Sequence, residues 1–286
     1  MLAPTFSERN AELVWDESIL QAEQMLKSWL DCKSTEAPCI PNVRADTMML
    51  PFNVINKAGF GVDLPWVSQS DPMSQTATTS SVDTADSGHY MSYREALHLL
   101  IRHLFHIIVL PTWLLRFAPF AYAKLLRTVH GEAIAYLKEL IKRKEDQLTR
   151  STKEAGPTSG SDIMSALVSA KLERQNRITR ESHTEGPEDE EALTEKAILA
   201  NVFLMLIAGH ETTATVLLLT LVELAINVEW QREVQKDLDQ ILGRRQKGCW
   251  NFRIDVAMLS NGTVGATINE ILRLYPPINV IPKGTR

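Results

Sequence analysis

Cysteine is scarce in this sequence, and its cysteines are not arranged as a structural or redox pair. Only Cys32, Cys39 and Cys249 occur in 286 residues. No two of them form a C-x-x-C pair, which removes the usual zinc and dithiol motifs. Three scattered cysteines also cannot supply the disulfide framework of a small secreted domain. We therefore expect ordinary thiols in a reducing compartment.

An excess of positive charge is missing as well. The chain has 30 Lys and Arg against 35 Asp and Glu, for a net charge of -5 at pH 7. Nucleic-acid binding depends on a basic field that neutralises phosphates, and here the basic side chains are mixed with acidic ones. We expect no nucleic-acid partner.

The sequence also lacks an uninterrupted apolar run of the kind that anchors a protein in a bilayer. Residues 1–9 contain no cationic segment followed by an apolar stretch, so this chain is expected to carry no signal peptide or anchor. Residues 99–120 contain Arg102, Pro111 and Arg116, which fit an apolar patch resting on a membrane surface better than a span. Residues 197–225 are longer, but Glu211 lies in their middle, and a span is the less favoured alternative there.

What the chain does have is apolar side chains, 44% of all residues, spaced at helical intervals. A mainly α fold with few strands is predicted, large enough to bury a core. Two polar, turn-rich stretches, 68–92 and 149–161, are expected to be irregular loops. The predicted helices are 10–30, 122–148, 162–172 with Asp162 as N-cap, 194–225, 227–242 and 266–274.

The apolar helix over 194–225 carries an unusual insertion, Ala-Gly-His-Glu-Thr-Thr at 208–213. Ala208, Gly209 and Thr212 lie three and four residues apart, so they share one face of the helix. Glycine lets a flat ligand approach the backbone, and a threonine hydroxyl bonded to the carbonyl four residues back can bend the helix. The face suits a planar cofactor with a small diatomic ligand. The alternative is a core helix with a small-residue packing contact and Glu211 in a structural network.

The zinc-protease motif is excluded on this helix by counting. The zinc-protease helix requires His-Glu-x-x-His, but Ala214 stands four residues after His210. We therefore expect His210 to be a packed or surface side chain, and we predict no metal ligand in this chain.

A second motif lies at 269–277, Asn-Glu-Ile-Leu-Arg-Leu-Tyr-Pro-Pro. Glu270 and Arg273 are three residues apart, so their side chains can form a bidentate ion pair on one helix face. Taken alone, such a pair is usually a surface ion pair. In this chain, however, the pair follows the helices predicted over 194–225 and 227–242, and that order favours a role in a family motif over an ordinary surface ion pair.

Taken in order, these motifs resemble the cytochrome P-450 family of haem-thiolate monooxygenases. Residues 208–213, 229–238 and 269–277 resemble its helices I, J and K, at similar spacing. A looser likeness extends the match over nearly the whole chain: residues 2–7 resemble the end of helix C, 59–66 a stretch before helix F, and 110–114 the F to G region. The resemblance implies a single partial domain over 1–286. It would be the central helical part of the family fold, without most of its β structure.

The resemblance also assigns roles to residues. Thr212 corresponds to the alcohol, and Glu211 to the acid, that supply protons to dioxygen. Ala208 and Gly209, with Thr212, would line the groove beside haem b. Glu270 and Arg273 correspond to a Glu-x-x-Arg pair that supports the haem-binding core without reacting.

The sequence departs from the family pattern at the iron ligand. The axial cysteine belongs to a Phe-x-x-Gly-x-Arg-x-Cys-x-Gly loop after the Glu-x-x-Arg helix, and none of the residues after Arg273 is cysteine. Cys249 precedes the pair and lies in Gln-Lys-Gly-Cys-Trp, which does not match. Because a thiolate ligand favours O–O cleavage, we expect this chain to be inactive alone.

The resemblance implies a haem- and dioxygen-dependent monooxygenase acting on a small, apolar organic substrate. Its partners would be an electron-donating reductase and, in the full-length parent, the cytoplasmic face of the endoplasmic reticulum membrane. The alternative from another class is a non-catalytic helical or membrane-peripheral interaction protein.

Overall fold

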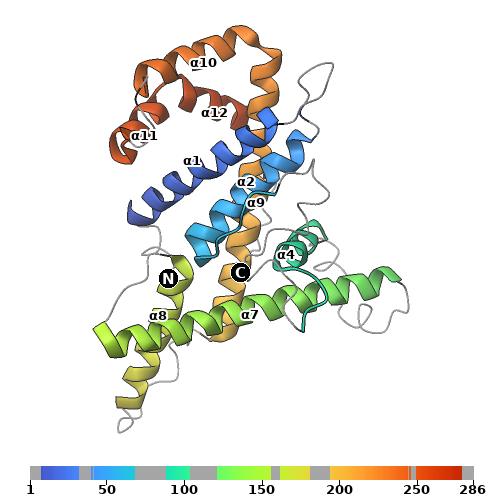
Figure 1. The fold of residues 1–286 in the computed structure, drawn as a ribbon, viewed down its shortest axis with the longest axis vertical. Coiled ribbons are helices and arrows are strands. Elements are labelled where there is room, and N and C mark those ends of the chain that lie inside the picture. Colours follow the sequence, from blue (N-terminus) through green and yellow to red (C-terminus); the bar gives the residue numbers. More distant parts are fainter. Residues whose placement is uncertain are drawn as a thin grey trace, which may run out of the picture. The chain divides into compact units, whose positions relative to one another are not determined.

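In the described part of the chain, the computed structural model is helical. It describes residues 8–31, 40, 42–67, 88–103, 121–155, 162–180, 194–243, 245 and 249–278, although not the side chains of 151–155 and 175–180. None of these residues lies in a strand, so the predicted mainly α fold is confirmed (Figure 1). The helices are α1 Glu8–Asp31, α2 Val43–Phe60, α4 Tyr93–Arg102, α7 Ala121–Ala155, α8 Ile163–Arg180, α9 Glu195–Ile226, α10 Val228–Ile241, α11 Phe252–Asn261 and α12 Thr263–Leu274.

The chain divides into two compact units. One comprises Met1–Asn10 with Ile55–Ile207, and the other comprises Ala11–Val54 with Ala208–Arg286. Helices α1, α2 and α9 contribute residues to both units.

In the first unit, α7 packs against α4 and against α8 (Figure 1). Its core is made of fully buried side chains from α4 and α7: Tyr93, Leu97, Leu100, Val129 and Leu137. Burial of each large apolar side chain contributes about 1.5–3 kcal/mol before the entropy cost of ordering it. Packing of this kind, rather than helix propensity, holds the unit together.

Asp162 is the N-cap of α8, as predicted. Its Oδ1 accepts a hydrogen bond from the Ser165 backbone N–H at 2.8 Å, which satisfies one of the first donors of the helix. Its Oδ2 accepts from Lys144 Nζ at 2.7 Å, which joins the start of α8 to α7. The helix continues to Arg180, beyond the predicted end at 172.

The predicted loop over 149–161 is wrong in its first half, because α7 continues to Ala155. Residues 149–155 contain no glycine or proline, and Gly156 and Pro157 follow. The helix therefore has no breaker until it reaches that pair.

Of the predicted loop over 68–92, residues 88–92 are described and are not helical. The rest of that loop lies outside the described residues, as do residues 104–120 of the predicted membrane-surface segment.

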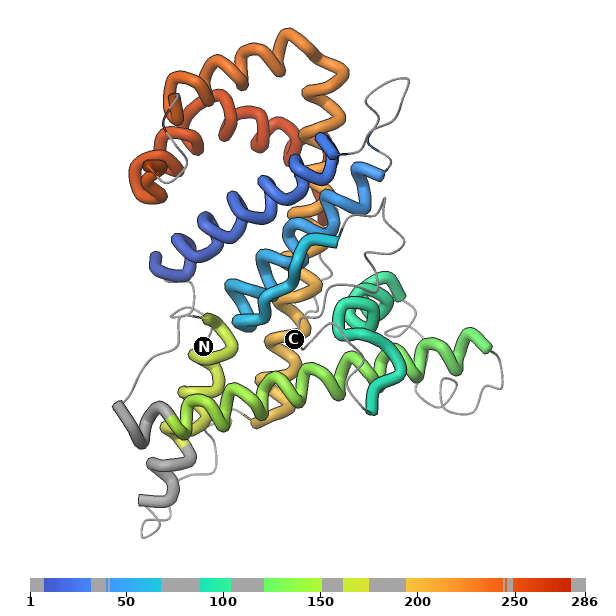
Figure 2. The backbone as a smooth tube through the Cα atoms, in the orientation of Figure 1, coloured from blue at the N-terminus to red at the C-terminus, as the bar shows by residue number. Residues whose placement is uncertain are grey.

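In the second unit, α1 and α2 run next to each other (Figure 2), and hydrogen bonds between polar side chains join them. Trp29 Nε1 donates to Asp46 Oδ2 at 2.8 Å, and Asn53 Nδ2 donates to Gln21 Oε1 at 2.8 Å. Helix α2 contains Pro51 and is not among the helices predicted from sequence. Proline removes one helical hydrogen bond there, and tertiary contacts such as these offset the loss.

Helices α10, α11 and α12 pack on one another in the second unit (Figure 1). Helix α12 begins at Thr263, three residues before the predicted start at Ala266. Its N-cap, Gly262, has no side chain, and Asp237 of α10 accepts from the Thr263 backbone N–H at 2.7 Å instead. A Cβ at Gly262 would lie 2.5 Å from Asp237 Oδ2, so a larger residue there would displace the carboxylate that caps the helix.

Arg245 joins the end of α10 to the start of α11. It donates to the carbonyls of Ile241 and Leu242 at 2.6 and 2.9 Å, and to Asp255 Oδ1 at 2.9 Å. The Asp255 side chain is only 1% exposed. The hydrogen bond from Arg245 lowers the pKa of Asp255, and burial opposes part of that shift.

We expect Arg245→Ala to lower the free energy of unfolding by about 1–3 kcal/mol at pH 7, because it leaves a buried carboxylate without its cation. Since the folded-state pKa is depressed, this contribution is present above the unfolded pKa of about 3.9 and disappears as pH falls through the folded value. Urea unfolding at neutral and acidic pH measures both effects. Lys236→Ala, which removes an exposed ion pair with Glu233 on α10, is the control and should change little. An equal loss in both variants would contradict the role given to Arg245.

Candidate active site

The helix that carries 208–213 is continuous. It runs from Glu195 to Ile226, so the prediction of one unbroken helix over 197–225 is confirmed. Thr194 starts it, accepting from the Ala197 backbone N–H at 3.2 Å. By length and composition, α9 is the one helix of the described residues that is able to cross a membrane, a test that core helices of soluble proteins also pass.

Thr212 makes the contact that its spacing predicts. Its hydroxyl donates to the Ala208 carbonyl oxygen, one turn back, at 2.5 Å. Thr220 makes the same kind of bond to Val216 at 2.8 Å. A back-bonded hydroxyl is held in one rotamer, and its oxygen lone pairs can accept a hydrogen bond from a neighbouring group.

The face around Thr212 is made of small side chains and is open. Ala208 and Glu211 are exposed, and Gly209 and Thr212 are half-buried. The structure therefore places the three predicted cofactor-lining residues on one face of α9, with the predicted acid beside them. A face of this kind leaves room for a flat ligand close to the backbone.

His210 lies on the other side of the helix and is packed in the second unit. It is 2% exposed, its Nε2 lies 3.0 Å from the Met48 carbonyl oxygen, and its ring meets Phe52 edge-on at 5.4 Å. Because a carbonyl can only accept, Nε2 carries the proton. Residues 208 and 212 lie about 200° around the helix from His210. Because His210 is anchored to α2, the face of α9 that carries Ala208 and Thr212 points away from that contact.

Glu270 and Arg273 form the predicted bidentate pair. Arg273 Nε and Nη2 donate to the two carboxylate oxygens of Glu270 at 2.8 and 2.6 Å. The hydrogen bond from Arg273 lowers the pKa of Glu270, and both side chains are exposed. Tyr275 then donates to Glu223 Oε1 at 2.7 Å, which joins the end of α12 to α9. Sequence reasoning did not find Tyr275 or Glu223, since they are far apart along the chain.

Within the described residues, no group of three His, Cys, Asp or Glu side chains is placed to hold a metal ion. Cys249 is a free, exposed thiol in the connection between α10 and α11. Cys32 and Cys39 lie outside the described residues. The described part of the chain thus has an open small-residue face on α9, and the thiol that it describes, Cys249, is exposed.

Comparison with known proteins identifies the family. The sequence profile of cytochrome P-450 matches residues 1–285. The chain belongs to the cytochrome P-450 family. Cytochrome P-450 monooxygenase 124 of Postia placenta is 29% identical over 282 residues, covering 98% of this chain and 47% of that protein. A cytokinin hydroxylase of Arabidopsis thaliana is 29% identical over 171 residues, 59% of this chain and 29% of that protein.

Solved structures show the same fold. The haem domain of cytochrome P-450DA matches with a TM-score of 0.57 at 17% identity, over 95% of this chain and 48% of that one. A mutant of that domain matches with a TM-score of 0.58. The chain spans about half the length of the curated relatives that match it end to end, such as the Postia placenta protein. The fold is the central helical part of a cytochrome P-450 haem domain.

The described residues fit one side of a haem and not the other. On α9, small side chains at 208 and 209 with a fixed hydroxyl at 212 match what a haem plane and a small ligand need. Cys249 does not match the position of the iron ligand, because it is an exposed thiol in the connection between α10 and α11 and its surrounding sequence, Gln-Lys-Gly-Cys-Trp, differs from the ligand loop.

Proposed function

We propose that this chain supplies the oxygen-side half of a haem- and dioxygen-dependent monooxygenase. The observation that carries the proposal is the Thr212 hydroxyl fixed on the Ala208 carbonyl, on the open small-residue face of a long apolar helix. Haem b, when bound with a thiolate, supplies the reduction of dioxygen and the cleavage of its O–O bond. The protein's own contribution on this side is to orient groups and move protons.

Thr212 and Glu211 divide the proton transfer between them. In this proposal the exposed Glu211 supplies the proton, and the half-buried Thr212, whose hydroxyl hydrogen is donated to the Ala208 carbonyl, accepts a hydrogen bond at its Oγ1 on the open face. A single hydroxyl with an acid beside it passes protons without admitting bulk water. Ala208 and Gly209 would lie against the haem plane. Glu270 and Arg273 would support the core around it and take no part in the chemistry.

The substrate and partners follow from the same proposal. Most residues of α9 are apolar and Leu204 is exposed on it, so we propose a small apolar organic molecule as the substrate. Electrons would come from a reductase. In the full-length parent the location would be the cytoplasmic face of the endoplasmic reticulum membrane, where residues 99–120 would rest on the bilayer.

A chimera tests the proposal. In it the 286 residues replace the matching part of the Postia placenta monooxygenase, which supplies the rest of its own sequence. We expect stoichiometric haem and the shifted band of a reduced, carbon-monoxide-bound haem-thiolate. A folded chimera that takes up no haem would contradict the proposal.

The competing function is a non-catalytic interaction protein. The exposed apolar side chains of the last three helices favour it, including Trp230, Ile254 and Ile268. The same chimera separates the two possibilities, because an interaction protein has no need of a haem face on α9.

A further inference from the structure

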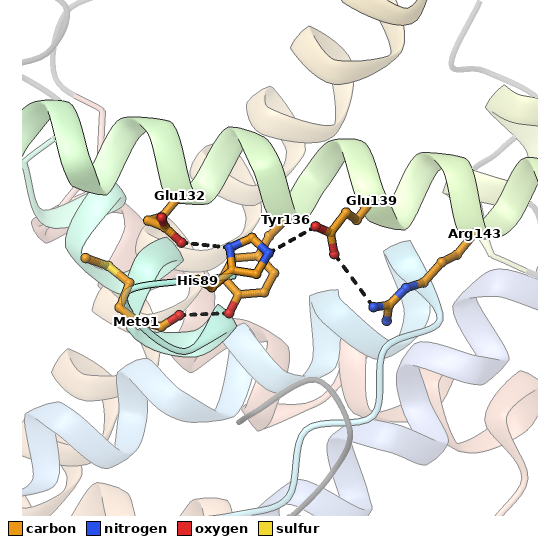
Figure 3. A network of polar contacts seen from close by, with 6 residues as sticks. All are labelled: His89, Met91, Glu132, Tyr136, Glu139 and Arg143. Carbon is orange, nitrogen blue, oxygen red and sulfur yellow. Dashed lines mark hydrogen bonds and ion pairs between the residues drawn. The ribbon is translucent and has the colours of Figure 1, made fainter. Parts of the chain in front are cut away.

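A histidine in the first unit lies between two carboxylates (Figure 3). His89 belongs to the segment 88–92, which leads into α4, and both acids lie on α7. Its Nδ1 is 2.7 Å from Glu132 Oε2, and its Nε2 is 3.0 Å from Glu139 Oε1. The side chains of His89 and Glu132 are only 10% and 11% exposed, and that of Glu139 is 43% exposed.

This geometry requires one protonation state. A neutral imidazole has one N–H donor and one nitrogen lone pair, whereas an imidazolium has two donors. A carboxylate oxygen is an acceptor only, so a neutral ring would direct a lone pair at one of the two acids. Only the charged ring donates to both Glu132 and Glu139.

The His89 ring also packs against α7 and so connects residues 88–92 to that helix. It stacks on Tyr136 with the ring centres 3.8 Å apart and the planes inclined by 14°. Tyr136 donates to the Met91 carbonyl oxygen at 2.7 Å, and its ring meets Tyr93 edge-on. The titratable and charged groups around His89 are Glu132, Tyr136, Glu139 and Arg143 on α7 and Tyr93 on α4. Arg143 faces the second oxygen of Glu139 at 3.7 Å.

We propose that His89 is a protonation-controlled clamp, which holds residues 88–92 on α7 when its ring is charged and releases them when the ring is neutral. Residue 92 is the N-cap of α4, with Ser92 Oγ accepting from the Glu95 backbone N–H at 3.3 Å. Release of the segment therefore loosens the start of α4.

The direction of the pH response follows from the surroundings of the ring. Burial lowers the pKa of His89, whereas hydrogen bonds with Glu132 and Glu139 and their negative charges raise it, and the net shift is upward. A raised folded-state pKa means that the clamp is fully formed below the ordinary histidine value of about 6.5. It is lost as pH rises through the folded-state value.

Chymotryptic cleavage after Tyr90, which is 87% exposed, measures release in the 286-residue chain. Rates at about pH 6 to 9 are divided by those of a free peptide of residues 85–95, which removes the pH dependence of the protease. We expect the normalised rate to rise above the ring's pKa, by up to about tenfold per pH unit. In His89→Gln, whose side chain does not titrate, the rate should not vary with pH.

Two further variants make the test specific. His130→Gln removes an exposed histidine of α7 and should keep the wild-type response. Glu139→Gln alters a partly exposed partner and should lower the pH at which cleavage accelerates, since one negative charge is removed. A wild-type rate that is flat across this range, or an unchanged response in His89→Gln, overturns the proposal.

Discussion

Thr212→Ala is expected to lower product formation about 100-fold in the chimera with the Postia placenta relative. A positioned group that transfers a proton typically contributes 10²- to 10⁴-fold to rate. The Thr212 hydroxyl is held by the Ala208 carbonyl at 2.5 Å, and alanine removes it while leaving the helix intact. Consumption of reductant should continue, because electron delivery does not pass through this side chain.

The control for this prediction is Thr220→Ala. Thr220 lies on the same helix and makes the same bond to the carbonyl four residues back, at 2.8 Å. It therefore reports any general effect of losing a back-bonded threonine from α9. Thr212→Ser, which keeps a hydroxyl, should recover most of the lost activity. If Thr212→Ala and Thr220→Ala have the same activity, Thr212 has no special part in proton transfer.

The features that sequence reasoning found are those governed by residues close together in the chain. The Thr212 bond to Ala208, the Asp162 cap and the Glu270–Arg273 pair all join residues three or four positions apart. Helical geometry alone brings such residues together. Sequence spacing was therefore sufficient to predict these contacts.

The features that sequence reasoning missed depend on contacts between residues that are distant in the chain. Helix α2 forms despite Pro51, because contacts with α1 offset the missing hydrogen bond. Helix α12 starts early because Asp237, 26 residues before Thr263, supplies the cap. His89 meets Glu132 and Glu139 across 43 and 50 residues. No local pattern distinguishes these side chains from solvated ones.

His210 shows how sequence spacing and tertiary contacts together explain one residue. Counting from His210 to Ala214 removes a zinc site, and the structure then gives the histidine its actual role, a contact with the Met48 carbonyl. That contact determines which way the neighbouring small-residue face points. His210, between the proposed site positions Gly209 and Glu211, is thus structural, and it lies on the side of α9 opposite Ala208 and Thr212.

A second prediction concerns the residue that would bind the haem iron. The 286-residue chain, purified and supplied with haem, is expected to give no stoichiometric haem-thiolate band in a reduced carbon-monoxide difference spectrum. An axial thiolate must be deprotonated and held by a rigid loop opposite Thr212. Cys249 is exposed between α10 and α11, and the sequences around Cys32 and Cys39 do not match the ligand loop either.

Adventitious haem binding can be distinguished from ligation by a thiolate. Ligation by an imidazole gives a different spectrum, and replacing each of Cys32, Cys39 and Cys249 with serine should leave the spectrum of any bound haem unchanged. The chimera, which joins the rest of the Postia placenta monooxygenase to the same α9 face, serves as the positive control. Only a thiolate has the electron donation that shifts the carbon-monoxide band and promotes O–O cleavage, so the same ligand governs the spectrum and the activity. A full-intensity thiolate band from the 286-residue chain, lost in one of the serine variants, would show that this chain's own cysteine serves the iron.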